Sequence, residues 1–308
     1  MSSTVIIPDE LIRNNAHARG AEGLRWLDRL PELVAEFGRR WSITVEPPFP
    51  SLSFNYAAPA VRADGTRAVL KLNFPGDREF ISEAEALRAF GGRGMARLLE
   101  VVLDEGAMLL ERLEPGKELH TLRNERREVS IAAATMKQLW RPPPPDHSFP
   151  TVAGWGKAFA RHRAEHGGTS GPLPRAIFER GETLYHELDA SAPERVLLHG
   201  DLHHGNILSA QREEWLAIDP KGIVGDPVSE TWPFLNNLWE DLYAISEPGR
   251  ILAARVALLA EELGVDRERV RLWGIAGCVL SAVWSAENNG TGWGGAIARA
   301  ELLAGMNG

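Results

Sequence analysis

The sequence predicts an α+β fold made of two lobes: a small antiparallel sheet with one inserted helix over residues 1–113, and a mainly helical lobe over residues 114–308. The length, 308 residues, is enough for two lobes with substantial cores. Strand and turn patterns are concentrated in the first part. After it, helical periodicity dominates and is interrupted only around residues 196–224.

In the first lobe, residues 9–40 place leucines and aromatic residues at helical spacing, which predicts one or two helices. Residues 41–50, WSITVEPPFP, predict a strand that ends at a proline-rich break. NYAAPAV and AVLKLNF flank RADGTR, and they are predicted to form a hairpin because Asp-Gly tolerates the positive φ of a tight turn. Residues 77–92 predict a helix closed by glycine, and residues 96–116 predict two strands around the turn DEG.

The second lobe is predicted to be helical around a short strand region. RREVSIAAATMKQLW, ILAARVALLAEEL and VRLWGIAGCVLSAVWSAE have the pattern of helices, whereas NILSAQREEWLAIDP reads as two short strands joined by a polar turn. Cys278 has no adjacent histidine and is predicted to be a buried helix residue. The tryptophans of this lobe are predicted to belong to its core: Trp232, Trp239, Trp273 and Trp284.

Composition narrows the possible partners and the compartment. The net charge is −8, of which −2 falls on residues 1–113 and −6 on the remainder. This balance argues against a nucleic-acid backbone as partner, which needs a basic face, and it is compatible with a cationic ligand. The N-terminal segment has no signal-peptide pattern, and no apolar run is long enough to span a membrane. A single cysteine suits a reducing compartment, so we expect a cytoplasmic protein.

The segment LLHGDLHHGNIL carries the most specific chemical signal. His199, Asp201 and Asn206 have the spacing H-x-D-x-x-x-x-N of a kinase catalytic loop. In such a loop a carboxylate must reach the substrate hydroxyl and an amide oxygen must reach a magnesium ion a few ångströms away. Asp219, at the end of the second short strand, is placed where a second metal-binding acid is needed.

Lys71 lies in the middle of the apolar strand AVLKLNF and is expected to seek an anion. The next helix offers Glu83 and Glu85 as partners, and a Lys–Glu pair of this kind binds nucleotide phosphates in kinases. The alternative is an edge-strand lysine that faces solvent.

These segments resemble the aminoglycoside phosphotransferase and choline-kinase superfamily. They are most similar to its streptomycin 6-phosphotransferase and hydroxyurea-phosphotransferase family. The resemblance spans most of residues 47–287, and its strongest part is HGDLHHGN followed by IDP about a dozen residues later. It implies a two-lobed, protein-kinase-like fold with ATP in the cleft.

The resemblance also implies roles for individual residues. Asp201 would accept the proton of the attacking hydroxyl, Asn206 and Asp219 would hold Mg²⁺, and Lys71 would bind phosphates, oriented by Glu83. Glu111 and Leu113, in the segment ERL, would form the linker that meets adenine. The loop SLSFNY, with Ser51 and Ser53, would cover the phosphates, although it lacks the glycines of a kinase loop. Candidates for contact with the substrate are His204 and Glu287.

The expected activity is therefore an ATP- and Mg²⁺-dependent transfer of phosphate to a hydroxyl of a small, cationic molecule such as streptomycin. Another hydroxylated metabolite or hydroxyurea is the alternative acceptor. Two other classes stay open at this point. One is a nucleotide-binding pseudokinase without turnover. The other is a metallophosphoesterase with His203 and His204 as ligands, although no histidine follows His204 to complete such a site.

Overall fold

The computed structural model describes residues 5–237, 247–289 and 292–306, and the chain divides into two compact units, Met1–Glu114 and Pro115–Gly308. The predicted boundary at 113/114 lies one residue from this division. Trp239, one of the predicted core tryptophans, lies outside the described residues. No helix in the described ranges is long and apolar enough to cross a membrane.

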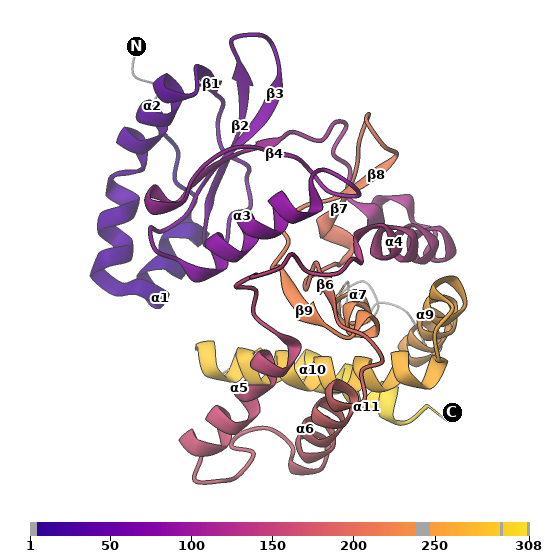
Figure 1. Ribbon diagram of the computed structural model, residues 1–308. Helices are drawn as coiled ribbons and strands as arrows, with labels where there is room; N and C mark the ends of the chain where they lie inside the picture. Colours follow the sequence, from indigo (N-terminus) through magenta and orange to yellow (C-terminus); the bar gives the residue numbers. More distant parts are fainter. Residues whose placement is uncertain (1–4, 238–246, 290–291, 307–308) are drawn as a thin grey trace. The chain divides into compact units, whose positions relative to one another are not determined.

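The first unit contains an antiparallel sheet with the strand order β1-β2-β3-β5-β4 (Figure 1). The predicted hairpin is its centre, with Gly65 at φ 85° and the Asp64 side chain accepting a hydrogen bond from Thr66 N (2.9 Å). Both predicted strands after the helix are also present. The strands are β1 (Ile43–Val45), β2 (Tyr56–Arg62), β3 (Arg67–Leu72), β4 (Leu98–Val102) and β5 (Ala107–Glu111).

Three helices accompany this sheet. The helix α3 (Arg78–Phe90) begins where Asp77 accepts a hydrogen bond from Glu79 N, and it ends at Gly91, whose φ of 59° is left-handed as predicted. The segment 9–40 forms two helices, α1 (Asp9–Asp28) and α2 (Leu30–Arg40). Their apolar residues pack with those of the strands into one core, which includes Leu30, Phe37 and Leu70. A short 3₁₀ turn, Leu103–Glu105, joins β4 to β5.

The second unit is mainly helical, with two short strand pairs (Figure 1). β6 (Val196–Leu198) pairs with β9 (Ile223–Gly225), and β7 (Ile207–Ser209) pairs with β8 (Trp215–Ala217). The helices are α4 (Glu125–Leu139), α5 (Val152–Glu165), α6 (Arg175–Ala190), α7 (Thr231–Asn236), α9 (Pro248–Leu263), α10 (Arg267–Asn289) and α11 (Gly294–Ala304). Short 3₁₀ turns are Leu119–Leu122, His204–Asn206 and Pro227–Glu230.

The helix α10 is the packing centre of this unit, because it contacts α5, α6, α7, α9 and α11. Glycines allow the close approaches. A Cβ on Gly277 would lie 2.2 Å from Cγ of Trp232, and one on Gly181 of α6 would lie 2.6 Å from Cβ of Val279. Cys278 and Trp273 of α10 are fully buried, as predicted, and Trp232 is 8% exposed, whereas Trp284 is only half-buried.

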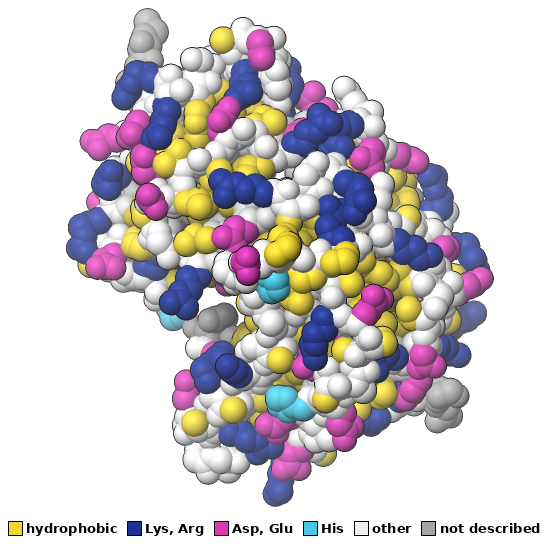
Figure 2. Space-filling model, in the orientation of Figure 1, with side chains coloured by type: hydrophobic (Ala, Val, Ile, Leu, Met, Phe, Trp, Pro, Cys, Tyr) yellow, Lys and Arg dark blue, Asp and Glu magenta, His cyan; other side chains and the backbone are white. Residues whose placement is uncertain are grey.

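Acidic and basic side chains are intermixed on the face of the molecule that Figure 2 shows. The chain also has surface ion pairs, such as Arg40 with Glu105 and Arg175 with Glu179. Pairs of this kind contribute little to stability because they stay solvated.

Candidate active site

Lys71 and Glu83 form a buried ion pair in the first unit. Lys71 lies on β3, which is flanked by β2 and β5, so it is not an edge-strand residue. Its Nζ is 2.6 Å from Oε1 of Glu83 on α3, and the two side chains are 8% and 9% exposed. The structure thus pairs Lys71 with Glu83, as expected, rather than with Glu85. A buried charge needs such a partner, because an unpaired one is strongly destabilising.

The loop before β2 is fastened to α1. The carbonyl of Ser53 accepts a hydrogen bond from the Asn14 side chain (2.9 Å), and that of Phe54 accepts one from Asn15 (3.0 Å). The side chains of Ser51 and Ser53 are exposed. Two side-chain amides therefore fix the path of a loop that has no glycine, while its hydroxyls stay accessible.

Glu111 and Leu113 lie at the end of the first unit. Glu111 is the last residue of β5, and its carboxylate accepts a hydrogen bond from Arg97 N (3.0 Å). The side chain of Leu113 is 8% exposed. The Glu111 carboxylate thus takes part in holding the strand end, and an adenine contact in this segment would fall to backbone groups.

The loop after β6 is organised by His199. Its Nε2 lies 2.7 Å from the carbonyl of Ile218, and its Nδ1 accepts a hydrogen bond from Asp201 N (3.2 Å). This assigns the neutral form with the proton on Nε2. Burial lowers the pKa of His199 to about 3, so the ring stays neutral at physiological pH. His199 thus holds the loop through hydrogen bonds at both ring nitrogens.

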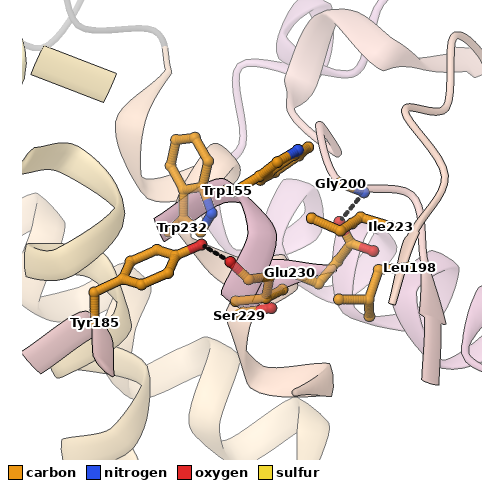
Figure 3. A pocket seen from close by; sticks show the side chains of 9 residues that line it. Trp155, Tyr185, Leu198, Gly200, Ile223, Ser229, Glu230 and Trp232 are labelled. Carbon is orange, nitrogen blue, oxygen red and sulfur yellow. Dashed lines mark hydrogen bonds between the residues drawn. The ribbon is translucent and has the colours of Figure 1, made fainter. Parts of the chain in front are cut away.

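Glu230 fixes the same loop through two backbone hydrogen bonds. Its Oε2 accepts a hydrogen bond from His199 N (2.6 Å), and its Oε1 accepts one from Gly200 N (2.8 Å) (Figure 3). Gly200 has φ 86°, a conformation that favours glycine. Burial raises the pKa of Glu230 to about 7, because the two N–H donors offset only part of the cost of burying the charge.

Asp226 supports the turn that carries Glu230. Its side chain accepts hydrogen bonds from Val228 N (3.0 Å), from Trp273 Nε1 (2.7 Å) and from Arg269 (2.6 and 2.8 Å). Asp226 is fully buried, so these donors replace its hydration. Asp226 therefore holds the turn from which Glu230 reaches the loop.

The structure brings the loop and the β7–β8 hairpin together through the backbone around Asn206. The Asn206 side-chain nitrogen donates to the carbonyl of Asp201 (2.9 Å), and the Asn206 carbonyl accepts from Ile218 N (3.0 Å). Asp219, which follows Ile218, is exposed and has φ 57°. A left-handed conformation at a residue other than glycine costs free energy and is common at functional sites.

This donor set fits a magnesium ion. The hydrogen bond to Asp201 uses the amide nitrogen of Asn206 and leaves its oxygen to accept, and Asp219 supplies an exposed carboxylate. Mg²⁺ prefers oxygen ligands and is usually held by one or two protein side chains together with substrate phosphates. Within the described residues, no group of three or more His, Cys, Asp and Glu side chains is placed to hold a metal by itself.

The remaining candidate site residues, His203, His204 and Glu287, have different surroundings. His203 Nε2 is 3.9 Å from Oδ1 of Asp201. His204 is fully buried and stacks on Phe234 with a ring-centroid distance of 3.8 Å, which favours a structural role over contact with the substrate. Burial lowers its pKa to about 2. Glu287 on α10 is 18% exposed and binds Arg161 through Oε2 (3.1 Å).

Comparison with known proteins identifies the family. Residues 41–289 match the family described as aminoglycoside/hydroxyurea antibiotic resistance kinase. The chain belongs to this family. It is therefore a phosphotransferase, as the resemblance implied, and the metallophosphoesterase and pseudokinase alternatives do not describe its class.

Relatives within this kinase family differ in the substrates they are named for. The chain is 35% identical to streptomycin 6-kinase of Streptomyces glaucescens over 290 residues, and this alignment covers 93% of each chain. It is 37% identical over 294 residues to hydroxyurea phosphotransferase of Kitasatospora aureofaciens, covering 94% of this chain and 82% of the relative. A choline/ethanolamine kinase family protein from Mesorhizobium loti superposes with a TM-score of 0.63 at 14% identity, covering 89% of this chain and 94% of the other. This likeness confirms the protein-kinase-like fold.

Sequence reasoning missed Trp155, which lines a pocket in the second unit together with Gly200, Glu230 and Trp232 (Figure 3). Trp155 lies between two glycines near the start of α5, in TVAGWGKAF. An isolated tryptophan beside small residues is a weak signal, because its neighbours in the fold come from distant segments.

Proposed function

We propose that this kinase transfers the γ-phosphoryl group of ATP, bound with Mg²⁺, to a hydroxyl of a small cationic acceptor, with streptomycin as the first candidate. The observation that carries the proposal is the anchored loop: the Asn206 side chain donates a hydrogen bond to the Asp201 carbonyl, and the Asn206 carbonyl accepts one from Ile218 N, the residue before Asp219. The streptomycin 6-kinase relative supports the choice of acceptor. The net charge of −6 on the second part of the chain favours a cation.

In this proposal the first lobe binds the nucleotide. The ammonium of Lys71 neutralises phosphate oxygens, and Glu83 orients it through their ion pair. Ser51 and Ser53 offer exposed hydroxyls to the phosphates, and the backbone of residues 111–113 meets adenine.

The second lobe carries the acceptor and the proton transfer. Asp201 orients the acceptor hydroxyl and takes its proton as the oxygen attacks phosphorus, a role that suits its side chain, which is 37% exposed. Asn206 and Asp219 would hold Mg²⁺, which when bound offsets negative charge on the phosphates. His199 and Glu230 keep the loop in one geometry, so most of the catalytic effect comes from positioning and electrostatics.

Hydroxyurea is the second candidate acceptor, because the hydroxyurea phosphotransferase relative is as similar to this chain as the streptomycin kinase. Hydroxyurea is small and uncharged, so it would gain nothing from an acidic lobe. We place the reaction in the cytoplasm, where ATP is available, with neither nucleic acid nor a membrane as partner.

The test is ADP release with Mg²⁺ and ATP in the presence of streptomycin or hydroxyurea. Streptomycin should stimulate ADP release in the wild-type chain, and Asp201→Asn should lower kcat by about 10²- to 10⁴-fold, the usual scale for a general base. Thermal melting and ATP binding of Asp201→Asn should stay close to wild type. Near-wild-type turnover of Asp201→Asn would remove Asp201 from this role, and stimulation by hydroxyurea alone would replace the acceptor.

A further inference from the structure

Two half-buried indole rings lie beside the proposed catalytic loop. A Cβ on Gly200 would lie 3.2 Å from Cη2 of Trp155, so the Trp155 ring contacts the residue that precedes Asp201. The Trp155 ring meets Trp284 edge-on, with a centroid distance of 5.3 Å and an interplanar angle of 86°. Trp284 in turn packs on the buried Trp232 at 6.3 Å. A group that lies on these rings is therefore close to Asp201.

These two tryptophans do not belong to the core of the unit. Trp232 and Trp273 are buried, whereas Trp155 and Trp284 stay half-exposed. Figure 3 shows the rings of Trp155 and Trp232 together at the pocket, with the Glu230 carboxylate engaged by Gly200. Indole faces attract cations through the ring quadrupole, so a paired, accessible set of them is suited to a cationic ligand.

Glu287 supplies a carboxylate with an unused oxygen at the same place. It lies three residues after Trp284 on α10, which puts both side chains on one face of the helix. Oε2 binds Arg161 of α5 (3.1 Å), while Oε1 is buried and has no hydrogen-bond partner among the described residues. A buried acceptor without a donor is destabilising, and a ligand that donates to it would remove that cost.

We propose that Trp155, Trp284 and Glu287 form a subsite for a guanidinium group of the acceptor, and that this subsite places the acceptor hydroxyl next to Asp201. A guanidinium is planar and can stack on an indole while it donates to a carboxylate in the plane of its N–H groups. A neutral sugar gains neither interaction. An ammonium group is attracted to the ring, but it lacks the planar set of N–H donors that a guanidinium offers to a carboxylate. The inference rests on the proposed function and specifies the acceptor class.

The test is calorimetric titration of the full-length chain without nucleotide, so binding is measured apart from turnover. The probes are streptomycin, which carries guanidinium groups, kanamycin, which carries only ammonium groups, and the neutral polyol myo-inositol. Streptomycin should bind most tightly. Glu287→Gln should raise its Kd by roughly 10- to 100-fold, and Trp284→Leu by about 3- to 30-fold.

The matched control is Arg161→Gln, which removes the partner of Glu287 but keeps its carboxylate. This variant should bind streptomycin as tightly as wild type or more tightly, and all variants should keep the KM for ATP within about twofold. If Trp284→Leu fails to fold, Trp155→Phe is the milder substitution, because it retains an aromatic face. Its Kd for streptomycin should rise by a few-fold.

The outcomes separate the subsite from the proposed function. Binding that depends on Glu287 without any turnover would support the subsite and refute streptomycin as acceptor. Turnover that depends on Asp201, together with wild-type binding in Glu287→Gln, would support the phosphotransfer and overturn the subsite. Equal affinity for myo-inositol and streptomycin, or no binding of streptomycin at all, would also overturn it.

Discussion

Replacing Glu230 with glutamine should reduce activity far more than stability. The carboxylate accepts hydrogen bonds from both His199 N and Gly200 N, but a glutamine in its place would accept only one and turn an amide N–H toward the other. Leaving a buried N–H donor unpaired against that amide N–H costs about 1–3 kcal/mol. Removing a buried charge returns about 3–4 kcal/mol, because the pKa of Glu230 is raised to about 7 from about 4.3 in an unfolded chain.

The two terms nearly cancel, so the free energy of unfolding of Glu230→Gln at pH 8 should lie within about 2 kcal/mol of wild type. The loop, however, loses one of its two anchors next to Asp201. A displacement of about 1 Å at such a position can lower a rate 100-fold, so kcat at pH 8 should fall about 10- to 100-fold. Urea unfolding gives the first quantity, and ADP release with streptomycin gives the second.

The pH dependence of the wild-type chain should show opposite trends in activity and stability. Because folding raises the pKa of Glu230, its contribution to stability is fully present below about pH 4 and is lost as the pH rises through 7. Activity should instead rise through pH 7, because only the ionised carboxylate accepts both N–H groups. Glu230→Gln should lack this rise in kcat.

Ser229→Ala is the matched control for Glu230→Gln. It alters the same 3₁₀ turn by removing a hydrogen bond to the carbonyl of Asp226 (2.6 Å), but it leaves both anchors of the loop in place. Its pH profile should therefore match the wild type. If Glu230→Gln keeps wild-type kcat, or retains a rise near pH 7, the loop is not positioned by Glu230 and the reasoning is wrong.

Three further predictions concern the nucleotide and the acceptor. Asp219→Asn, which tolerates the left-handed backbone at this position, should fold normally but raise the Mg²⁺ concentration needed for half-maximal activity at least tenfold; an unchanged requirement would remove Asp219 from the metal site. Lys71→Met should lower the free energy of unfolding by about 3–5 kcal/mol because the buried Glu83 loses the ammonium group of its ion pair, and the double variant with Glu83→Leu should recover most of this loss in urea unfolding; no recovery would mean that the pair is not the cause. The KM for streptomycin should rise between low and physiological salt while the KM for ATP changes less, because charge attraction in water is screened over about 8 Å at physiological ionic strength; parallel changes would argue against a cationic acceptor site.

Local signals in the sequence were enough to predict the first unit. Asp64-Gly65 set the hairpin, and the glycines after Phe90 ended α3, because each determines its turn through backbone conformation alone. Spacing within one loop likewise predicted that Asp201 and Asn206 lie together. The strand before the loop, β6, was harder to predict, because β6 and β9 have three residues each and are far apart in the sequence.

The surroundings of individual side chains could not be predicted from the sequence. His204 and Glu287 were both candidates for substrate contact, yet the first is buried against Phe234 and the second is paired with Arg161. Trp284 has the same helical periodicity as the buried Trp273, so periodicity alone assigns both to the core. Trp284 instead meets Trp155 of α5 edge-on, a contact between distant segments that periodicity does not encode.

The close packing of Gly277 against Trp232 has a consequence for how acceptor preference can change. Trp232 packs on Trp284. A methyl group added at Gly277, more than one helical turn from Trp284, would therefore displace the rings of Trp232 and Trp284 while every residue of the proposed subsite stays unchanged. The acceptor preference of the proposed subsite can therefore change through a substitution in the interior of α10. Surveys of variants that examine only the pocket lining would overlook it.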